Sequence, residues 1–289
     1  IPPPLRNSIL LTNWGLTTDY EKTGLAAYLD KGPCFRPGQD ILIPAPFNSG
    51  HSRSPFRRQN TPAPARHSPY NRRQLMQSEA QLYPPQWAEG RTQLVYFKGR
   101  INWGGGGAAV LADGKVMYSH GVRKALHDMY EDSEDVFINK PGGDASKALF
   151  CLAPAGLGFG VRVWHSIADG CIPLIIQDNV TQAYEDDFLP YSRFAVRMKE
   201  DDIPRMREIL LAYTDDEIAA MQREMECVWP YMIWSSVYGA FGNENGENDA
   251  YEALLRTLER RKNKLPFKEV SLCKAGSGGG GGGGGGEHE

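Results

Sequence analysis

The amino-acid sequence predicts an α/β protein built on a parallel sheet whose faces are covered by helices. Strand-like apolar runs alternate with amphipathic helical segments along the second half of the 289-residue chain. Continuous apolar runs such as 171–176 are typical of strands that are buried on both faces. With 41% hydrophobic residues and a formal net charge of −3, the composition is that of a globular protein and argues against a general nucleic-acid binder.

Four segments follow one another along the chain. Residues 1–47 are predicted to form a partial N-terminal lobe, and residues 91–265 form a C-terminal lobe that carries most of the regular pattern. Between them, residues 48–90 are rich in proline and arginine and almost without acidic residues, which predicts a flexible connector. Residues 266–289 contain a long glycine run and are predicted to be a disordered tail.

Hydrophobic periodicity and turn residues define the elements within these segments. The predicted strands are 8–15, 40–47, 94–97, 136–138, 148–152, 171–176 and 194–198. The predicted helices are 118–130, about 160–169, one through 206–210, one that begins after 214, and about 249–263. The glycine run 104–107 is predicted to be a loop.

Capping residues support the helix ends. Ser119 and Asp202 are candidate N-caps, and residues 214–217 have the spacing of a capping box. Gly170 stands where a C-terminal glycine ends a helix, and Pro230 should kink the helix that contains it.

The segment 150–178 carries the clearest chemistry. A strand enters a loop with Gly156, Gly158 and Gly160, and a helix begins beside it, so unbonded backbone N–H groups and the positive helix end face one space. This arrangement predicts an anion pocket, in which Arg162 adds a bidentate grip on phosphate oxygens. The alternative is a tight turn beside a surface arginine. The glycine spacing matches neither the dinucleotide fingerprint nor the P-loop.

Further candidates surround this pocket. Helical spacing places His165, Ser166 and Asp169 on the face of Arg162. His165 can stack on a nucleotide or hydrogen-bond to it, and its alternative is a structural role.

Charged residues at strand and helix ends extend the set. Asp178 and Glu185 follow a predicted strand and can accept hydrogen bonds from sugar or ribose hydroxyls; the alternative is solvated loop carboxylates. Lys98 and Arg123 are second candidates for a diphosphate, with solvated surface charge as the alternative.

Several motifs in this chain also occur together, and in this order, in one known family. They are 12–15 (TNWG), 33–44 (PCFRPGQDILIP), 94–99 (LVYFKG), 118–123 (YSHGVR), 150–156 (FCLAPAG), 160–162 (GVR), 170–173 (GCIP), 175–178 (IIQD), 191–196 (YSRFAV) and 202–204 (DIP). They resemble the signature of the exostosin-like glycosyltransferases, family 47, in a plant or algal form. Two positions depart from the pattern: His165 stands where the family often has an acidic residue, and Ala183-Tyr184 replaces Pro-Phe.

The resemblance implies a GT-B fold of two Rossmann-like lobes, here N-terminally truncated with the N-terminal lobe incomplete and the nucleotide-sugar donor held by the C-terminal lobe. It implies an inverting transfer (EC 2.4 class) from a UDP-sugar to a polysaccharide or glycoprotein glycan, on the lumenal side of the Golgi membrane. We see no signal peptide and no apolar window of membrane-spanning length, so the expected membrane anchor would lie outside this chain. A second glycosyltransferase is an expected partner.

No metal is expected to be obligatory, because the Asp pairs at 186–187, 201–202 and 215–216 are adjacent rather than spaced for a shared cation. The general base is left unassigned among Asp19, Asp40, His51 and residues outside the chain. A catalytically inactive glycan- or nucleotide-binding module is the alternative function, and the glycine spacing disfavours an NAD-linked oxidoreductase.

The five cysteines are spaced neither for zinc nor for a thioredoxin-like site. Cys151 and Cys171 are expected to be buried thiols at neighbouring strand starts, with a disulfide as the alternative.

Overall fold

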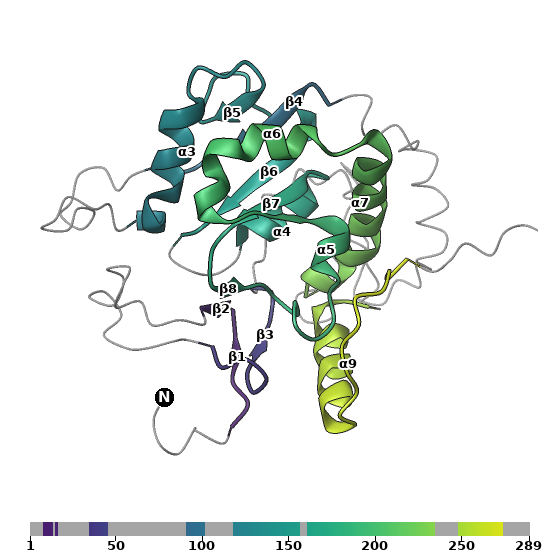
Figure 1. Ribbon diagram of the computed structural model, residues 1–289. Helices are drawn as coiled ribbons and strands as arrows, with labels where there is room; N and C mark the ends of the chain where they lie inside the picture. The colour runs from purple at the N-terminus through teal and green to yellow at the C-terminus, as the bar shows by residue number, and fades with distance from the viewer. Residues whose placement is uncertain are drawn as a thin grey trace, which may run out of the picture.

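The computed structural model describes residues 8–13, 15–16, 35–45, 91–101, 118–156, 161–234 and 248–273 (Figure 1). Its centre is a five-stranded sheet in which all neighbouring strands are parallel. The strands are β4 (Gln93–Phe97), β5 (Val136–Ile138), β6 (Ala148–Pro154), β7 (Ile172–Ile176) and β9 (Val196–Arg197). The predicted parallel sheet is therefore confirmed, and the predicted strands 94–97, 136–138, 148–152 and 171–176 coincide with four of these five. The predicted strand 194–198 is shorter in the structure, because Phe194 ends a helix and only Val196–Arg197 pair in the sheet.

The strands lie in the order β5-β4-β6-β7-β9. The chain thus runs from β4 outward to β5, and then returns to build β6, β7 and β9 on the other side of β4. A reversal of this kind is a topological switch point, and it opens a crevice between the carboxyl ends of β4 and β6.

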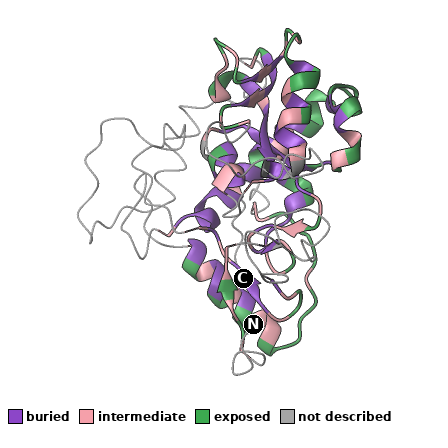
Figure 2. Ribbon diagram, turned by 90° about the vertical axis from the view of Figure 1, so that its left-hand side faces the viewer, coloured by how far each residue is buried: buried purple, intermediate pink, exposed green. Residues whose placement is uncertain are grey.

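The helices pack against the sheet and against one another. The α-helices are α3 (Val122–Tyr130), α4 (Val161–Ala168), α5 (Tyr191–Phe194), α6 (Met206–Leu211), α7 (Asp215–Val228) and α9 (Ala250–Lys262). The 3-10 helices are η3 (Tyr118–Gly121), η4 (Ala145–Lys147), η5 (Glu200–Arg205) and η6 (Trp229–Met232). Helix α4 packs against β6 and β7, and α7 packs against α5 and β7. Figure 2 shows the buried residues gathered along the central strands.

The capping predictions have mixed outcomes. The capping box is confirmed, because Thr214 Oγ1 accepts from Glu217 N and the Glu217 carboxylate accepts from Thr214 N. Gly170 has a φ of 65°, as a C-terminal glycine requires. The N-cap role of Asp202 is wrong, since η5 starts at Glu200 and the amide of Asp202 already donates to Lys199 O. At Pro230, α7 has given way to η6.

The described residues of segment 1–47 pack against the rest of the chain, below the main sheet in Figure 1. Strand β1 (Leu11–Thr12) pairs with β3 (Ile41–Leu42), and β2 (Gly15–Leu16) pairs with β8 (Val180–Thr181) of the C-terminal part. These strands are shorter than the predicted 8–15 and 40–47.

Hydrogen bonds add to this contact: Tyr184 N donates to Leu42 O (3.0 Å), and Trp234 Nε1 donates to Pro44 O (3.0 Å). The predicted connector up to residue 90 and the 104–107 loop lie outside the described residues.

Two disulfides cross-link the structure. Cys151 pairs with Cys171 across the β6–β7 side of the sheet, and Cys227 of α7 pairs with Cys273. The expectation that Cys151 and Cys171 are free thiols is therefore wrong: Cys171 enters β7 beside β6, and the Cα atoms of the two cysteines are 5.6 Å apart, a distance that a disulfide spans. The tail was expected to begin at 266; the structure ties residues 271–273 to α7, and residues 274–289 lie outside its description.

No helix among the described residues combines the length and the apolar character needed to cross a membrane.

Candidate functional site

The candidate site is the crevice at the switch point, where the loops that follow β4 and β6 meet. Parallel strands place their carboxyl ends at one edge of the sheet, so residues 98–101 and 155–156 leave the sheet side by side. Ligands of open α/β sheets bind at this position. Two arginines from different helices reach it.

Arg123 enters the crevice from the first turn of α3. Its side chain is buried, Nε donates to Ala155 O (3.0 Å), and Nη1 donates to Arg100 O (3.1 Å). The guanidinium thereby bridges the two loops. The predicted N-cap role of Ser119 is wrong, because η3 occupies residues 118–121 and Gly121 is the N-cap of α3. The Ser119 hydroxyl nevertheless supports the first turn, since its Oγ accepts from Arg123 N (3.2 Å). Arg123 Cζ lies 5.3 Å from the centre of the Phe97 ring.

Arg162 reaches the same loop from the first turn of α4. Its Nη1 donates to Lys98 O (2.8 Å), and its Cζ lies 4.9 Å from the centre of the Phe97 ring. Both guanidiniums therefore contact one aromatic ring at the end of β4, a favourable arrangement for cations. The ammonium-bearing residue Lys98 is exposed beside them.

The start of α4 lies at this crevice, and the anion pocket there stays a prediction. Helix α4 begins at Val161, and the N–H groups of its first turn have no partners within the helix. Gly158 and Gly160 of the predicted loop lie outside the described residues, whereas Gly156 is described.

Two glycines leave room for the guanidiniums. A Cβ on Gly156 would lie 2.8 Å from Arg123 Nη2, and a Cβ on Gly99 would lie 2.4 Å from Arg162 Nη2. Both distances are far below van der Waals contact, so any side chain at either position would push a guanidinium away. These two positions need glycine because it has no side chain, and not because the backbone has a positive φ.

Asn139 fixes the loop after β4. Its Nδ2 donates to Gly99 O (2.7 Å) and its Oδ1 accepts from Gly99 N (2.9 Å), while its own backbone has a φ of 54° that asparagine tolerates well. No sequence pattern pointed to a role for Asn139, Gly99 or Phe97. The motif 94–99 contained two of them, but only the pairing of β4 with β5 brings Asn139 to Gly99.

A groove of about 190 Å³ extends from the crevice along α4. The four residues predicted to share one helix face all line it, namely Arg162, His165, Ser166 and Asp169. His165 is exposed and edge-on to Trp164, at 5.1 Å between ring centres. Ser166 is buried and its Oγ donates to Arg162 O (2.8 Å), so this hydroxyl supports the helix turn beneath Arg162.

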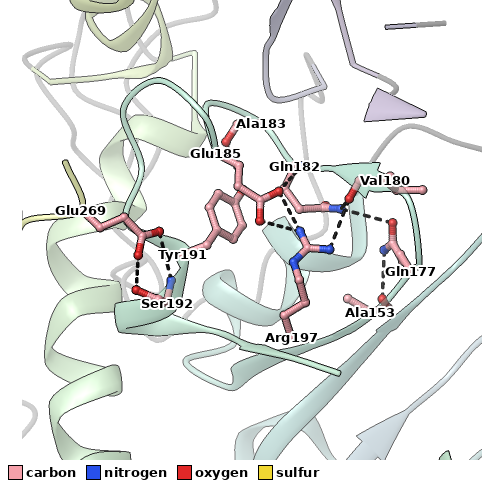
Figure 3. Close-up of polar contacts among 10 residues, drawn as sticks. All are labelled: Ala153, Gln177, Val180, Gln182, Ala183, Glu185, Tyr191, Ser192, Arg197 and Glu269. Atoms are coloured by element: carbon pink, nitrogen blue, oxygen red, sulfur yellow. Dashed lines mark hydrogen bonds and ion pairs between the residues drawn. The ribbon is translucent and has the colours of Figure 1, made fainter. Parts of the chain in front are cut away.

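Asp178 and Glu185 lie on the other side of the sheet edge, beyond β7, and neither lines the groove. The Asp178 carboxylate accepts from Glu200 N (3.3 Å). Glu185 accepts from Arg197 Nη2 with both oxygens (2.6 and 2.7 Å) and from Gln182 N (2.7 Å), as Figure 3 shows. Both carboxylates thus bind groups of this chain and hold loops in place. The sequence predicted contacts of these two carboxylates with sugar or ribose hydroxyls.

Asp40, one of the candidates for the general base, is fully buried. It accepts from Leu10 N (3.1 Å) and from Arg36, whose Nη2 lies 2.6 Å from Oδ1. Burial alone would raise the pKa of Asp40, but these hydrogen bonds outweigh it and hold the pKa below its ordinary value. A carboxylate with these partners has a structural role.

The other two candidates for the base, Asp19 and His51, lie outside the described residues. In the part of the chain that the structure describes, no three His, Cys, Asp or Glu side chains gather as a metal site.

Comparison of the sequence with known proteins identifies a family for this chain. Residues 31–213, more than half of the chain, match the family described as the Exostosin GT47 domain. Two probable glucuronosyltransferases of Oryza sativa subsp. japonica are similar: one is 29% identical over 72% of this chain and 45% of its own length, the other 30% over 70% and 45%. The probable beta-1,4-xylosyltransferase IRX10 of Arabidopsis thaliana is 28% identical over 55% of this chain and 38% of its own. The chain spans less than half the length of these relatives. It belongs to the exostosin family of glycosyltransferases, GT47.

Proposed function

We propose that this chain contains the donor-binding lobe of an inverting glycosyltransferase, which transfers a sugar from a UDP-sugar to a polysaccharide or glycoprotein glycan. The observation that carries the proposal is the convergence of Arg123, Arg162 and the start of α4 on the switch-point crevice. Two fixed cations and a helix N-terminus suit a group with two negative charges close together, such as a diphosphate.

The same groups can assist the reaction. As the bond from the anomeric carbon to the diphosphate breaks, negative charge grows on the leaving UDP, and donors already in position stabilise it without reorganising. Guanidinium and helix-terminal N–H groups supply this stabilisation without a metal ion, so we propose that no metal is obligatory. The acceptor hydroxyl loses its proton to a base that we do not assign.

The wider assignments rest on the family and on the disulfides. We propose a GT-B architecture in which a second Rossmann-like lobe closes over the crevice, with segment 1–47 contributing to it. Two disulfides favour an oxidising compartment, which fits the lumenal side of the Golgi membrane. The names of the relatives make UDP-glucuronic acid and UDP-xylose the first donors to test. A second glycosyltransferase is the partner that we propose from the family resemblance.

Calorimetric titration of UDP into single variants tests the donor site. Arg162→Ala should weaken binding roughly 10- to 100-fold, since a hydrogen bond to a charged group contributes about 1.5–3 kcal/mol. Arg123→Lys should also weaken binding, because lysine keeps the charge but loses the planar fork. Arg205→Ala is the matched control, as Arg205 is exposed and paired with Glu208.

An unchanged UDP affinity in Arg162→Ala would refute the donor site. The inactive-module alternative makes a different prediction: the chain would bind UDP, yet the full-length protein would never release UDP from any UDP-sugar.

A further inference from the structure

A second, open pocket lies at the carboxyl end of β9, with a volume of about 670 Å³. One wall is the loop after β7, which supplies residues 179–181, Glu185 and Asp186; Arg197 of β9 stands beside it. The other wall is the C-terminal segment, which supplies Phe267 and Glu269. Figure 3 shows Glu185 and Arg197 with Glu269 on the far side of Tyr191.

The first wall is rigid because Glu185 and Arg197 are paired within it. Arg197 donates to both oxygens of Glu185 and, from Nη1, to Val180 O (3.3 Å). Glu185 in turn accepts from Gln182 N. The loop is therefore tied to β9 at three points.

The second wall is held just as firmly. The Cys227–Cys273 disulfide anchors the C-terminal segment to α7, and the buried Glu224 accepts from Ser271 Oγ and Leu272 N, both at 2.6 Å. The Glu269 carboxylate accepts from the hydroxyl of Ser192. A pocket between two fixed walls is preformed, which lowers the entropic cost of binding.

The lining chemistry suits hydroxyl groups. Carboxylates accept, Arg197 donates, and the asparagine and threonine side chains of 179–181 do both, around the aromatic ring of Phe267. Among the described residues, no three carboxylates of the pocket gather as a metal site. Glu185 is neutralised by Arg197, so Asp186 and Glu269 leave an excess of negative charge that disfavours phosphates and uronic acids.

We propose that this pocket is a subsite for an uncharged oligosaccharide, the acceptor chain of the reaction. The assignment rests on the proposed glycosyltransferase function. The pocket and the donor crevice lie at the same edge of one sheet, and β9 is two strands beyond β6. At about 4.8 Å per strand, β6 and β9 lie roughly 10 Å apart, within the reach of a short oligosaccharide.

Titration of xylohexaose into the 289-residue chain tests the subsite. We expect Phe267→Ala to weaken binding roughly tenfold through loss of the aromatic contact, and Asp186→Asn to weaken it severalfold. Phe267→Tyr should retain binding, and Val270→Ala, on an exposed residue of the same segment, is the matched control. All four should bind UDP like the parent chain.

Three results would overturn the proposal: no binding of xylohexaose or cellohexaose, unchanged affinity in both folded variants Phe267→Ala and Asp186→Asn, or tighter binding of hexagalacturonate than of the uncharged hexamers. Failure of the donor site is separately visible. In that case Arg162→Ala would leave UDP affinity unchanged, whatever the oligosaccharide titrations show.

Discussion

Replacing Gly156 by alanine tests whether nucleotide binding depends on the close approach of Arg123 to the loop after β6. The new Cβ would lie 2.8 Å from Arg123 Nη2, whereas ordinary van der Waals contact begins at 3.4 Å. The guanidinium must therefore retreat by about half an ångström. Its hydrogen bonds to Ala155 O and Arg100 O, now 3.0 and 3.1 Å, would then reach the limit of useful length.

The magnitude follows from these two bonds. Each bond from a charged donor contributes about 1.5–3 kcal/mol when intact, and stretching forfeits part of each, so we expect a loss of about 1–2 kcal/mol in unfolding free energy. That loss lowers Tm by a few degrees in a chain of this size. Because the cation is displaced from the crevice, we also expect a roughly tenfold weaker UDP affinity.

A double-mutant cycle with Arg123→Ala is the decisive assay. In that background the Cβ added at position 156 would meet no guanidinium, so Gly156→Ala should have little further effect on UDP affinity measured by calorimetry. An equal loss of affinity with and without Arg123 would refute the reasoning, as would a wild-type affinity in Gly156→Ala itself.

Three further predictions concern the supports of the site and the fold. Removing the Cys151–Cys171 disulfide by two alanine substitutions should lower the unfolding free energy by about 3 kcal/mol for a 20-residue separation, measured by urea denaturation without reductant; an unchanged midpoint would contradict it. Asp40 has a lowered pKa in the folded state, so its stabilisation is present above its unfolded pKa of about 3.9 and is lost as pH falls through the folded value. Asp40→Asn should remove that acid-dependent loss and cost about 1.5–3 kcal/mol at neutral pH, and an unaltered pH profile of Tm would count against this role. Asn139→Gly keeps the left-handed backbone but removes both bonds to Gly99, so UDP affinity should fall severalfold, with Asn139→Asp intermediate; equal affinities for all three would exclude a positioning role.

Local patterns were reliable guides to the elements. The apolar runs at 136–138 and 171–176 and the capping box at Thr214 appear in the structure close to their predicted positions, because each is decided by neighbours along the chain. Asp202 shows the limit of this reasoning. An aspartate before a helix is a good cap in isolation, but here the turn has already been closed by Lys199.

The site likewise combines features that a local sequence pattern predicted with features that depend on the fold. Arg162 and the start of α4 were predicted from a strand, a glycine loop and a helix, all within one stretch of sequence. The contact of Glu185 with Arg197 was not predicted, since it depends on how β9 lies beside the loop after β7. The Cys151–Cys171 pair was left open for the same reason: spacing along the chain does not reveal how closely the start of one strand approaches its neighbour.

The sequence by itself determined the α/β class, the order of strands and helices, and the family to which the chain belongs, because periodicity, caps and motifs are properties of contiguous residues. Only the tertiary structure decided that β4 and β6 are neighbours. That adjacency brings Arg123 and Arg162 to one phenylalanine ring, and it arises from the burial of whole strands against one another, a long-range free energy that no short segment records.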